Sequence, residues 1–209
     1  AWRDNALGEQ PGAPDRQPGA PDGRPILTFG DAYAWEHWLA EHYASSDGVW
    51  LRFAKKRSGV TTVNYSEALD VALCFGWIDS QVRKLDITSY LQRWTPRRPR
   101  SPWSQVNREK VAVLVAQDRM RPAGTREVER AKADGRWEHA YQRQSAATVP
   151  DDLRAALDAE PAAAAFFETL SSQNRYAVLY RVQDAKRPAT RARRIATFVA
   201  MLAEGKTLH

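Results

Sequence analysis

Residues 64–80 read NYSEALDVALCFGWIDS, and they define one helix together with the points at which it begins and ends. Asn64 stands at the position of an N-cap, and Glu67 follows three residues later, which is the spacing of a capping box. Residues 68–75 are almost all apolar, so the helix that they form must be buried on most of its surface. Gly76 then offers the left-handed backbone conformation at which helices commonly end. The pattern predicts a buried helix that stops at this glycine.

Short strands are expected on both sides of this helix. Ile26–Phe29 and Val49–Phe53 are rich in aromatic and branched residues, and Asp86–Trp94 alternates between two sides, which is typical of a strand. Ser58-Gly59 indicates a turn, after which Val60–Val63 can return as a partner strand. We therefore expect an α+β fold in which a small antiparallel sheet packs with helices and is followed by a C-terminal all-helical module.

Composition along the chain suggests four segments. Residues 1–25 contain a repeated Gln-Pro-Gly-Ala-Pro-Asp unit that can bury little surface, and we expect a disordered Pro/Gly-rich leader there. Residues 26–141 then form the α+β core domain, and the polar stretch 142–148 is a linker. Residues 149–209 carry helix start and stop signals throughout, so we predict that they form the helical module.

Charge and cysteine usage narrow the function classes. The chain of 209 residues has a formal net charge of +6 and one cysteine, Cys74, so no internal disulfide can form and a cytoplasmic location is expected. The four histidines show no metal-binding spacing, and we expect no metal and no cofactor. No apolar run is long enough to span a membrane. The positive charge is modest and the sequence contains no recognised nucleic-acid-binding motif, so nucleic acid is not the expected partner.

One span, residues 73–107, concentrates the side chains from which a ligand pocket can be built. Asp79 is a solitary acid after an apolar run, and it is the first candidate for catalysis, with Tyr65 and Glu67 as a second acid–base pair. Two of them have structural alternatives: a salt bridge to Arg97 or a cap of the following turn for Asp79, and helix capping for Glu67. The candidate ligand-binding residues are Trp77, Trp94, Arg97, Trp103, Asn107 and Lys56.

The alternatives for these ligand-binding candidates also remain open. Arg97 follows a proline that stiffens the loop, and a guanidinium group can grip an anion, but a solvated basic loop is equally consistent. Trp103 and Asn107 stand four residues apart at an expected helix start, and would share a helix face. Ser104 is better explained as the N-cap of that helix. Lys56 ends a strand, where a surface position is the default.

Several motifs resemble one known family. They are Ala72-Leu-Cys-Phe-Gly-Trp-Ile-Asp-Ser80, Thr95-Pro-Arg-Arg98, Trp103-Ser104, Asp134-Gly-Arg-Trp137 and Val149-Pro-Asp-Asp-Leu153, with Leu202-Ala-Glu-Gly-Lys206 near the end. Together, over about residues 30–207, they resemble the YdeI/OmpD-associated family, also called bacteriocin-protection proteins. The resemblance implies a link to antimicrobial tolerance and no defined reaction. Trp94 stands where the family pattern looks like Phe, so ligand preference is not carried over.

Three functions follow from these observations. The first is a protein that binds a small molecule, anionic or aromatic in character, and gives tolerance to an antimicrobial or natural product by binding or modifying it. The second is an enzyme of specialised metabolism or self-resistance that uses Asp79 for acid–base chemistry. The third is a basic nucleic-acid-binding or regulatory adaptor that uses residues 93–100 and 186–194.

Overall fold

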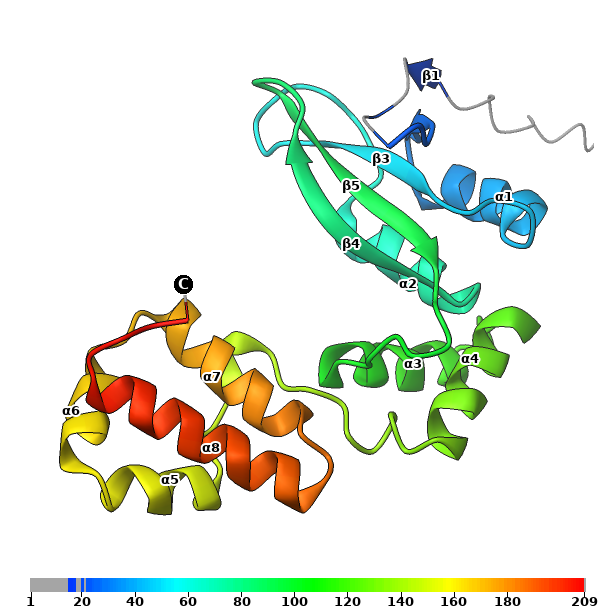
Figure 1. Ribbon diagram of the computed structural model, residues 1–209. Helices are drawn as coiled ribbons and strands as arrows, with labels where there is room; N and C mark the ends of the chain where they lie inside the picture. Colours follow the sequence, from blue (N-terminus) through cyan, green and yellow to red (C-terminus); the bar gives the residue numbers. More distant parts are fainter. Residues whose placement is uncertain (1–14, 18–19, 21, 209) are drawn as a thin grey trace, which may run out of the picture. The chain divides into compact units, whose positions relative to one another are not determined.

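A computed structural model describes residues 15–17, 20 and 22–208 of the chain (Figure 1). The chain divides into two compact units. Unit 1 combines residues 1–101 with 107–138, and unit 2 combines residues 102–106 with 139–209. The elements confirm the expected α+β class, with the sheet in unit 1 and the all-helical module in unit 2. None of the helices in the described part of the chain has the length and apolarity needed to cross a membrane.

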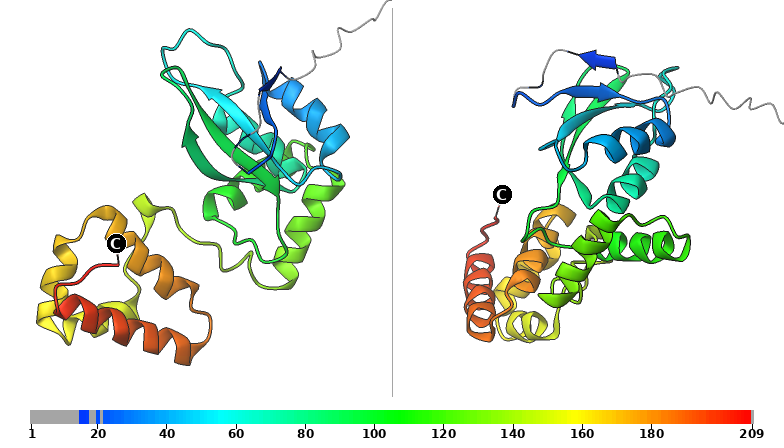
Figure 2. Two further views of the ribbon diagram at one scale, coloured as in Figure 1. Left: turned by 45° about the horizontal axis from the view of Figure 1, so that its top comes forward. Right: turned by 90° about the vertical axis from the view of Figure 1, so that its right-hand side faces the viewer.

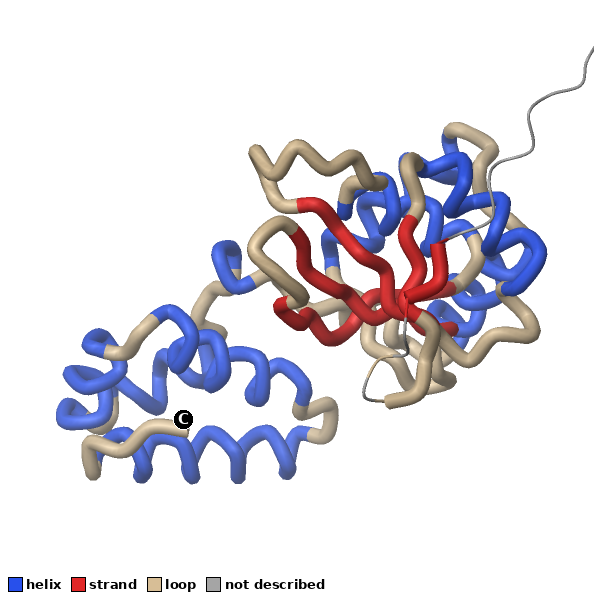
Figure 3. Tube along the Cα trace, turned by 90° about the horizontal axis from the view of Figure 1, so that it is seen from above, coloured by secondary structure: helices blue, strands red, loops and turns tan. Residues whose placement is uncertain are grey.

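The sheet of unit 1 has five strands in the order β1-β2-β3-β5-β4 (Figure 3). They are β1 (Asp15–Gln17), β2 (Ile26–Thr28), β3 (Val49–Ala54), β4 (Trp77–Lys84) and β5 (Ser89–Pro96). The sheet is mixed, because β2 pairs with β3 in parallel while the other pairs are antiparallel. Three of the four pairings are antiparallel as expected, and the β2–β3 pairing departs from the expectation. A helix connects β2 to β3, and such a crossover is what parallel neighbours require.

Two further expectations about strands were wrong. Residues 60–63 form a loop instead of a strand, in which the Thr62 hydroxyl accepts a hydrogen bond from the Ala54 amide at 2.9 Å. The chain after Gly76 enters β4 directly, whereas no strand was expected there. Gly76 has φ +73° and ends the helix as predicted. The consequence for function is that Asp79 lies on a strand, opposite Trp94 of β5.

Four helices belong wholly or mainly to unit 1: α1 (Ala32–His42), α2 (Tyr65–Cys74), α3 (Gln105–Ala116) and α4 (Pro122–Ala133). Helices α1 and α2 lie side by side on one face of the sheet (Figure 2). The expected capping box begins α2, since the Glu67 amide donates to the Asn64 side chain at 2.9 Å. Trp35 and Trp38 of α1 stack at 5.5 Å between ring centroids, inside the core as expected.

The segment before β2 differs from the leader predicted for residues 1–25. Residues 1–14, 18–19 and 21, with Trp2 among them, lie outside the described residues. The described remainder joins the fold: β1 pairs with β2, and Ala20 is buried against Ile26, Trp50 and Leu91. Asp22 accepts a hydrogen bond from the Trp50 indole at 2.9 Å. A proline- and glycine-rich stretch therefore contributes buried contacts on the sheet face opposite Trp94.

Unit 2 is a small helical module. It contains a short 3₁₀ turn (Gln144–Ala146) followed by α5 (Asp151–Asp158), α6 (Pro161–Thr169), α7 (Ser172–Asp184) and α8 (Pro188–Ala203). Helices α5, α6 and α7 each contact α8, which is the long central element (Figure 1). Its Ile195, Phe198 and Leu202 enter the apolar core, as the spacing of these residues predicts.

Candidate functional site

The Asp79 carboxylate connects three elements of unit 1 by hydrogen bonds. Its Oδ2 atom accepts one hydrogen bond from the Tyr65 hydroxyl at 3.1 Å and another from the Gln92 side-chain amide at 2.7 Å. Tyr65 comes from the first turn of α2, Asp79 from β4 and Gln92 from β5. We call Tyr65, Asp79 and Gln92, with the neighbouring Trp94 and Arg97, the Asp79 cluster.

Burial governs the electrostatics of this cluster. Removal from water raises the pKa of the Asp79 carboxyl above its ordinary value, and this effect exceeds the opposing effects of the Tyr65 hydrogen bond and the Arg97 charge. Arg97 is itself only 6% exposed. The charge of Arg97 therefore acts on Asp79, and Arg97 lies inside the fold and not on a solvated loop.

Trp94 forms an aromatic wall beside the carboxylate. Its side chain is fully buried, and its ring centroid lies 6.1 Å from that of Tyr65 and 6.3 Å from those of Phe53 and Trp35. The buried indole N–H of Trp94 has no hydrogen-bond acceptor among the described residues. A buried donor of this kind normally finds a protein group, a water molecule or a ligand.

Two of the predicted residues have structural roles instead. Glu67 completes the capping box, because its side chain accepts a hydrogen bond from the Asn64 amide at 3.5 Å. Trp77 is 1% exposed, donates its indole N–H to the Tyr43 carbonyl at 3.2 Å and packs edge-on against Trp35. Capping and core packing account for both side chains.

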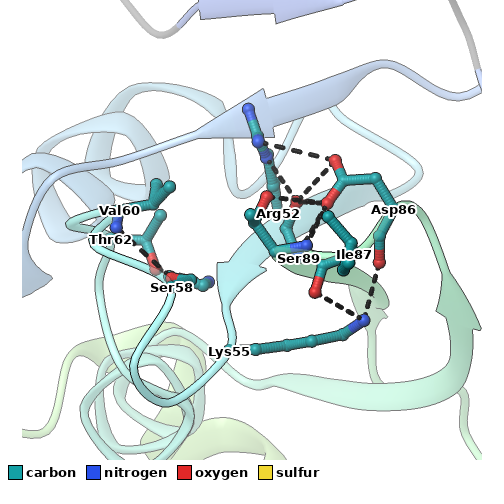
Figure 4. A network of polar contacts seen from close by, with 10 residues as sticks. Arg52, Lys55, Ser58, Val60, Thr62, Asp86, Ile87 and Ser89 are labelled. Atoms are coloured by element: carbon teal, nitrogen blue, oxygen red, sulfur yellow. Dashed lines mark hydrogen bonds and ion pairs between the residues drawn. The ribbon is translucent and has the colours of Figure 1, made fainter.

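Lys56 is exposed in the loop after β3, and no described contact joins it to the Asp79 cluster. The preceding residue, Lys55, donates to the backbone carbonyls of Asp86 and Ile87 at 2.6 and 3.4 Å (Figure 4). Asp86 in turn accepts from the Thr88 and Ser89 amides, at 2.7 and 2.8 Å. This network shapes the turn between β4 and β5, so that β5 begins at Ser89 and not at Asp86 as predicted.

Trp103 and Asn107 do not share a helix face. Helix α3 begins at Gln105, so Trp103 precedes it, and its carbonyl accepts from the Tyr141 amide at 2.9 Å. Trp103 belongs to unit 2, whereas Asn107 belongs to unit 1. Both side chains are buried. The spacing was interpreted with a helix start two residues too early, which is a common error at helix boundaries.

Gln92 belongs to the Asp79 cluster but was not among the candidate residues predicted from the sequence. The alternation of residues 86–94 already placed Gln92 on the same side as Trp94, which was the available signal. Its partner became visible only with β4, whose pairing with β5 brings Asp79 opposite Trp94 and Val82 opposite Gln92 across a register shift. An irregularity of this type re-aims side chains in a way that strand periodicity does not reveal.

Three arginines of the expected basic surfaces form ion pairs within the fold. Arg93 lies 3.6 Å from Asp22, Arg191 binds Asp152, and Arg194 lies 3.3 Å from Asp184. Among the residues that the structure describes, no group of three or more His, Cys, Asp or Glu side chains could hold a metal ion. The Cys74 thiol is buried, and burial raises its pKa to about 11, which suppresses the nucleophilic thiolate.

Comparisons with known proteins divide the chain in a similar way. Residues 27–127, which contain the Asp79 cluster, match a family model described as a domain of unknown function (DUF8412). Residues 146–205 match the family model described as "Bacteriocin-protection, YdeI or OmpD-Associated". No curated protein and no solved structure matches the chain. The motifs of residues 72–107 thus fall within the first match, and α5–α8 within the second. The helical module of this chain is therefore similar to the bacteriocin-protection, YdeI- or OmpD-associated family over residues 146–205.

Proposed function

We propose that this protein binds a small molecule at the Asp79 cluster and gives tolerance to an antimicrobial or natural product by that binding. The family of the helical module supports the biological setting, since its description is bacteriocin protection. The cluster itself lies in the other matched region, for which no function is described. The chemical part of the proposal therefore rests on the geometry around Asp79.

The observation that supports this proposal is the partly buried Asp79 carboxylate, which accepts a hydrogen bond from Tyr65, a residue that reaches the surface. Tyr65 is 39% exposed, while Gln92 is 5% exposed and Asp79 lies between them in burial. A ligand that contacts Tyr65 is then one hydrogen bond away from the Asp79 carboxylate. Perturbed carboxyl groups of this kind gather at functional sites more often than elsewhere.

This arrangement favours a particular ligand group. Arg97 is buried and its positive charge already acts on Asp79, so it offers no exposed guanidinium group to a ligand anion. We therefore revise the expected anionic ligand: a hydrogen-bond donor such as an amine, amide or hydroxyl is the better match to Asp79. An aromatic part of the ligand can contact the exposed edge of Tyr65.

Titration calorimetry tests the proposal against a panel of peptide antimicrobials and aromatic natural products. Asp79→Asn and Tyr65→Phe are the informative variants, and Asp70→Asn is the matched control because Asp70 is a half-buried carboxylate of α2 paired with Lys110 at 2.6 Å. We expect at least one compound to bind the wild type and the control alike, with affinity reduced about tenfold by Asp79→Asn. Binding that is the same in all four proteins, or none across the panel, would reject this site.

A second candidate is an enzyme that modifies the compound. It is favoured by the raised pKa of Asp79, which brings the carboxyl closer to a proton-donating role, and by the Tyr65 hydroxyl at 3.1 Å. Mass spectrometry of a bound compound after incubation distinguishes the two functions. Turnover that Asp79→Asn abolishes while binding persists would establish catalysis, and an unchanged compound would leave binding as the function.

A further inference from the structure

The helical module contains a groove lined by residues of α5 and α8, and none of its lining residues belongs to the Asp79 cluster. Its volume is about 670 Å³, which is within the usual range of small-molecule sites. Both helices belong to unit 2, so the groove is formed within one compact unit. Most of its lining is apolar: Ala156, Pro188, Ala192, Ile195, Ala196, Val199, Ala200 and Ala203.

The groove has open space over α8 because this helix presents small side chains to it. Ala192, Ala196 and Ala200 recur every four residues and so lie along one face of the helix. Ile195, which is buried, and the half-buried Val199 lie beside them. A larger side chain at any of these alanines would occupy the space that the groove leaves open.

Charge is distributed unevenly along the groove. At one end, Arg191 binds Asp152 through two hydrogen bonds of 2.5 and 2.9 Å and also donates to the Val182 carbonyl at 2.9 Å. These two opposite charges compensate each other. The third charged lining residue is Glu160, which follows α5 and whose carboxylate has no hydrogen bond or ion pair with any residue that the structure describes.

The end of the groove near Glu160 therefore favours a positive charge. Asp152 lies in the first turn of α5, whereas Glu160 follows the last residue of that helix. Ala200 and Ala203 line the groove in the last turn of α8, where the carbonyl end of the helix also attracts cations. Lys206, the cation that follows this helix, is already paired with Glu204 at 2.6 Å.

We propose that the α5–α8 groove binds an amphiphilic cation, with its apolar body over the alanine face of α8 and its basic group against Glu160. The site lies outside the Asp79 cluster and is independent of the function proposed there. Volume, apolar lining and one carboxylate without an ion pair among the described residues together select this ligand class over neutral or anionic molecules of the same length.

Three probes that share one apolar chain test the ligand class: n-octylammonium, n-octanol and n-octanoate. Each is titrated into the intact 209-residue chain carrying ¹³C-methyl alanine, and shifts of the Ala192, Ala196 and Ala200 methyl signals report binding. We expect n-octylammonium to bind about three- to fivefold more tightly than n-octanol, the gain of an exposed ion pair, and n-octanoate to bind most weakly.

Two variants and their controls locate the site. Glu160→Gln should remove the preference for n-octylammonium and keep n-octanol binding, whereas Asp158→Asn, an exposed acid of α5 outside the lining, should change neither. Ala196→Leu should abolish binding of all three probes, while Ala189→Leu, elsewhere on α8, should not. Equal affinities for the three probes, or a preference that survives Glu160→Gln, would overturn the assignment, as would methyl signals that do not move. Asp79→Asn should leave these titrations unchanged, which separates this site from the Asp79 cluster.

Discussion

The Tyr65 hydroxyl lies 3.1 Å from Oδ2 of Asp79, although 14 positions separate the two residues in the sequence. The connection is formed because α2 ends at Gly76 and the chain returns at once as β4, beside the start of the same helix. A residue from the beginning of a helix and one from the following strand thus meet across the helix–sheet layer. The stability of this contact should depend on whether Asp79 is ionised.

Asp79→Asn should change the pH dependence of stability. Burial raises the pKa of Asp79 in the folded chain above the unfolded value of about 3.9, so the folded state holds the proton more tightly. The free energy of unfolding of the wild type therefore falls as the pH rises from the unfolded pKa of Asp79 through its folded pKa. The Asn variant has no carboxyl group at this position, so its stability does not fall for this reason. In urea unfolding, the free energy of unfolding of the variant relative to that of the wild type should be higher at pH 7 than at pH 4. A difference that is the same at both pH values would contradict the expectation.

Tyr65→Phe should raise the pKa of Asp79 further, because the lost hydrogen bond favours the ionised carboxylate. The free energy of unfolding should fall by about 0.5–1.5 kcal/mol, the usual net value of one hydrogen bond. A ¹³C-carboxyl NMR titration measures the pKa, and chemical unfolding measures the stability. Tyr33→Phe, which removes an exposed hydroxyl from α1, is the control and should alter neither quantity. An Asp79 titration that is identical in wild type and Tyr65→Phe would refute the contact.

Asp86→Ala should loosen the β4–β5 turn drawn in Figure 4. Hydrogen bonds from Thr88 and Ser89 hold the pKa of Asp86 well below its ordinary value. Its stabilising contribution is therefore complete above about pH 4 and is lost as pH falls below that point. The variant should have a lower melting temperature at pH 7 and faster amide exchange at Thr88 and Ser89. Ile87→Ala removes a side chain that is 89% exposed from the same turn and should leave both measurements unchanged.

The helix α2 could be predicted from the sequence because its signals are local. Asn64 and Glu67 cap it within four residues, and Gly76 ends it by its own conformational freedom. The helical module was predictable for the same reason, since each of its helices has start and stop residues. Both depend on interactions between neighbours in the chain.

The strand β4 was not predictable, and neither was the way in which Asp79 meets the other residues of the Asp79 cluster. Its residues Trp77–Lys84 lie at the edge of the sheet, where only Trp77 is buried, so they lack the alternation that identifies a strand. The parallel pairing of β2 with β3 is likewise set by the tertiary fold. Gln92 was visible on the correct side of its strand, but its partner depended on a register that no local pattern encodes.

Gly124→Ala should destabilise unit 1, although alanine normally strengthens a helix by about 0.8–1 kcal/mol relative to glycine. A Cβ atom at Gly124 of α4 would lie 2.2 Å from the Cys74 carbonyl oxygen and 2.6 Å from that of Leu73, both backbone atoms of α2. The two helices would have to separate, and overpacking of this kind costs about 1–3 kcal/mol. Gly30→Ala is the matched control, because a Cβ there meets nothing within 4 Å. Urea unfolding should therefore show a clear loss for Gly124→Ala and a change within about 0.5 kcal/mol for Gly30→Ala. A stabilised Gly124→Ala variant would show that α2 and α4 do not approach each other this closely.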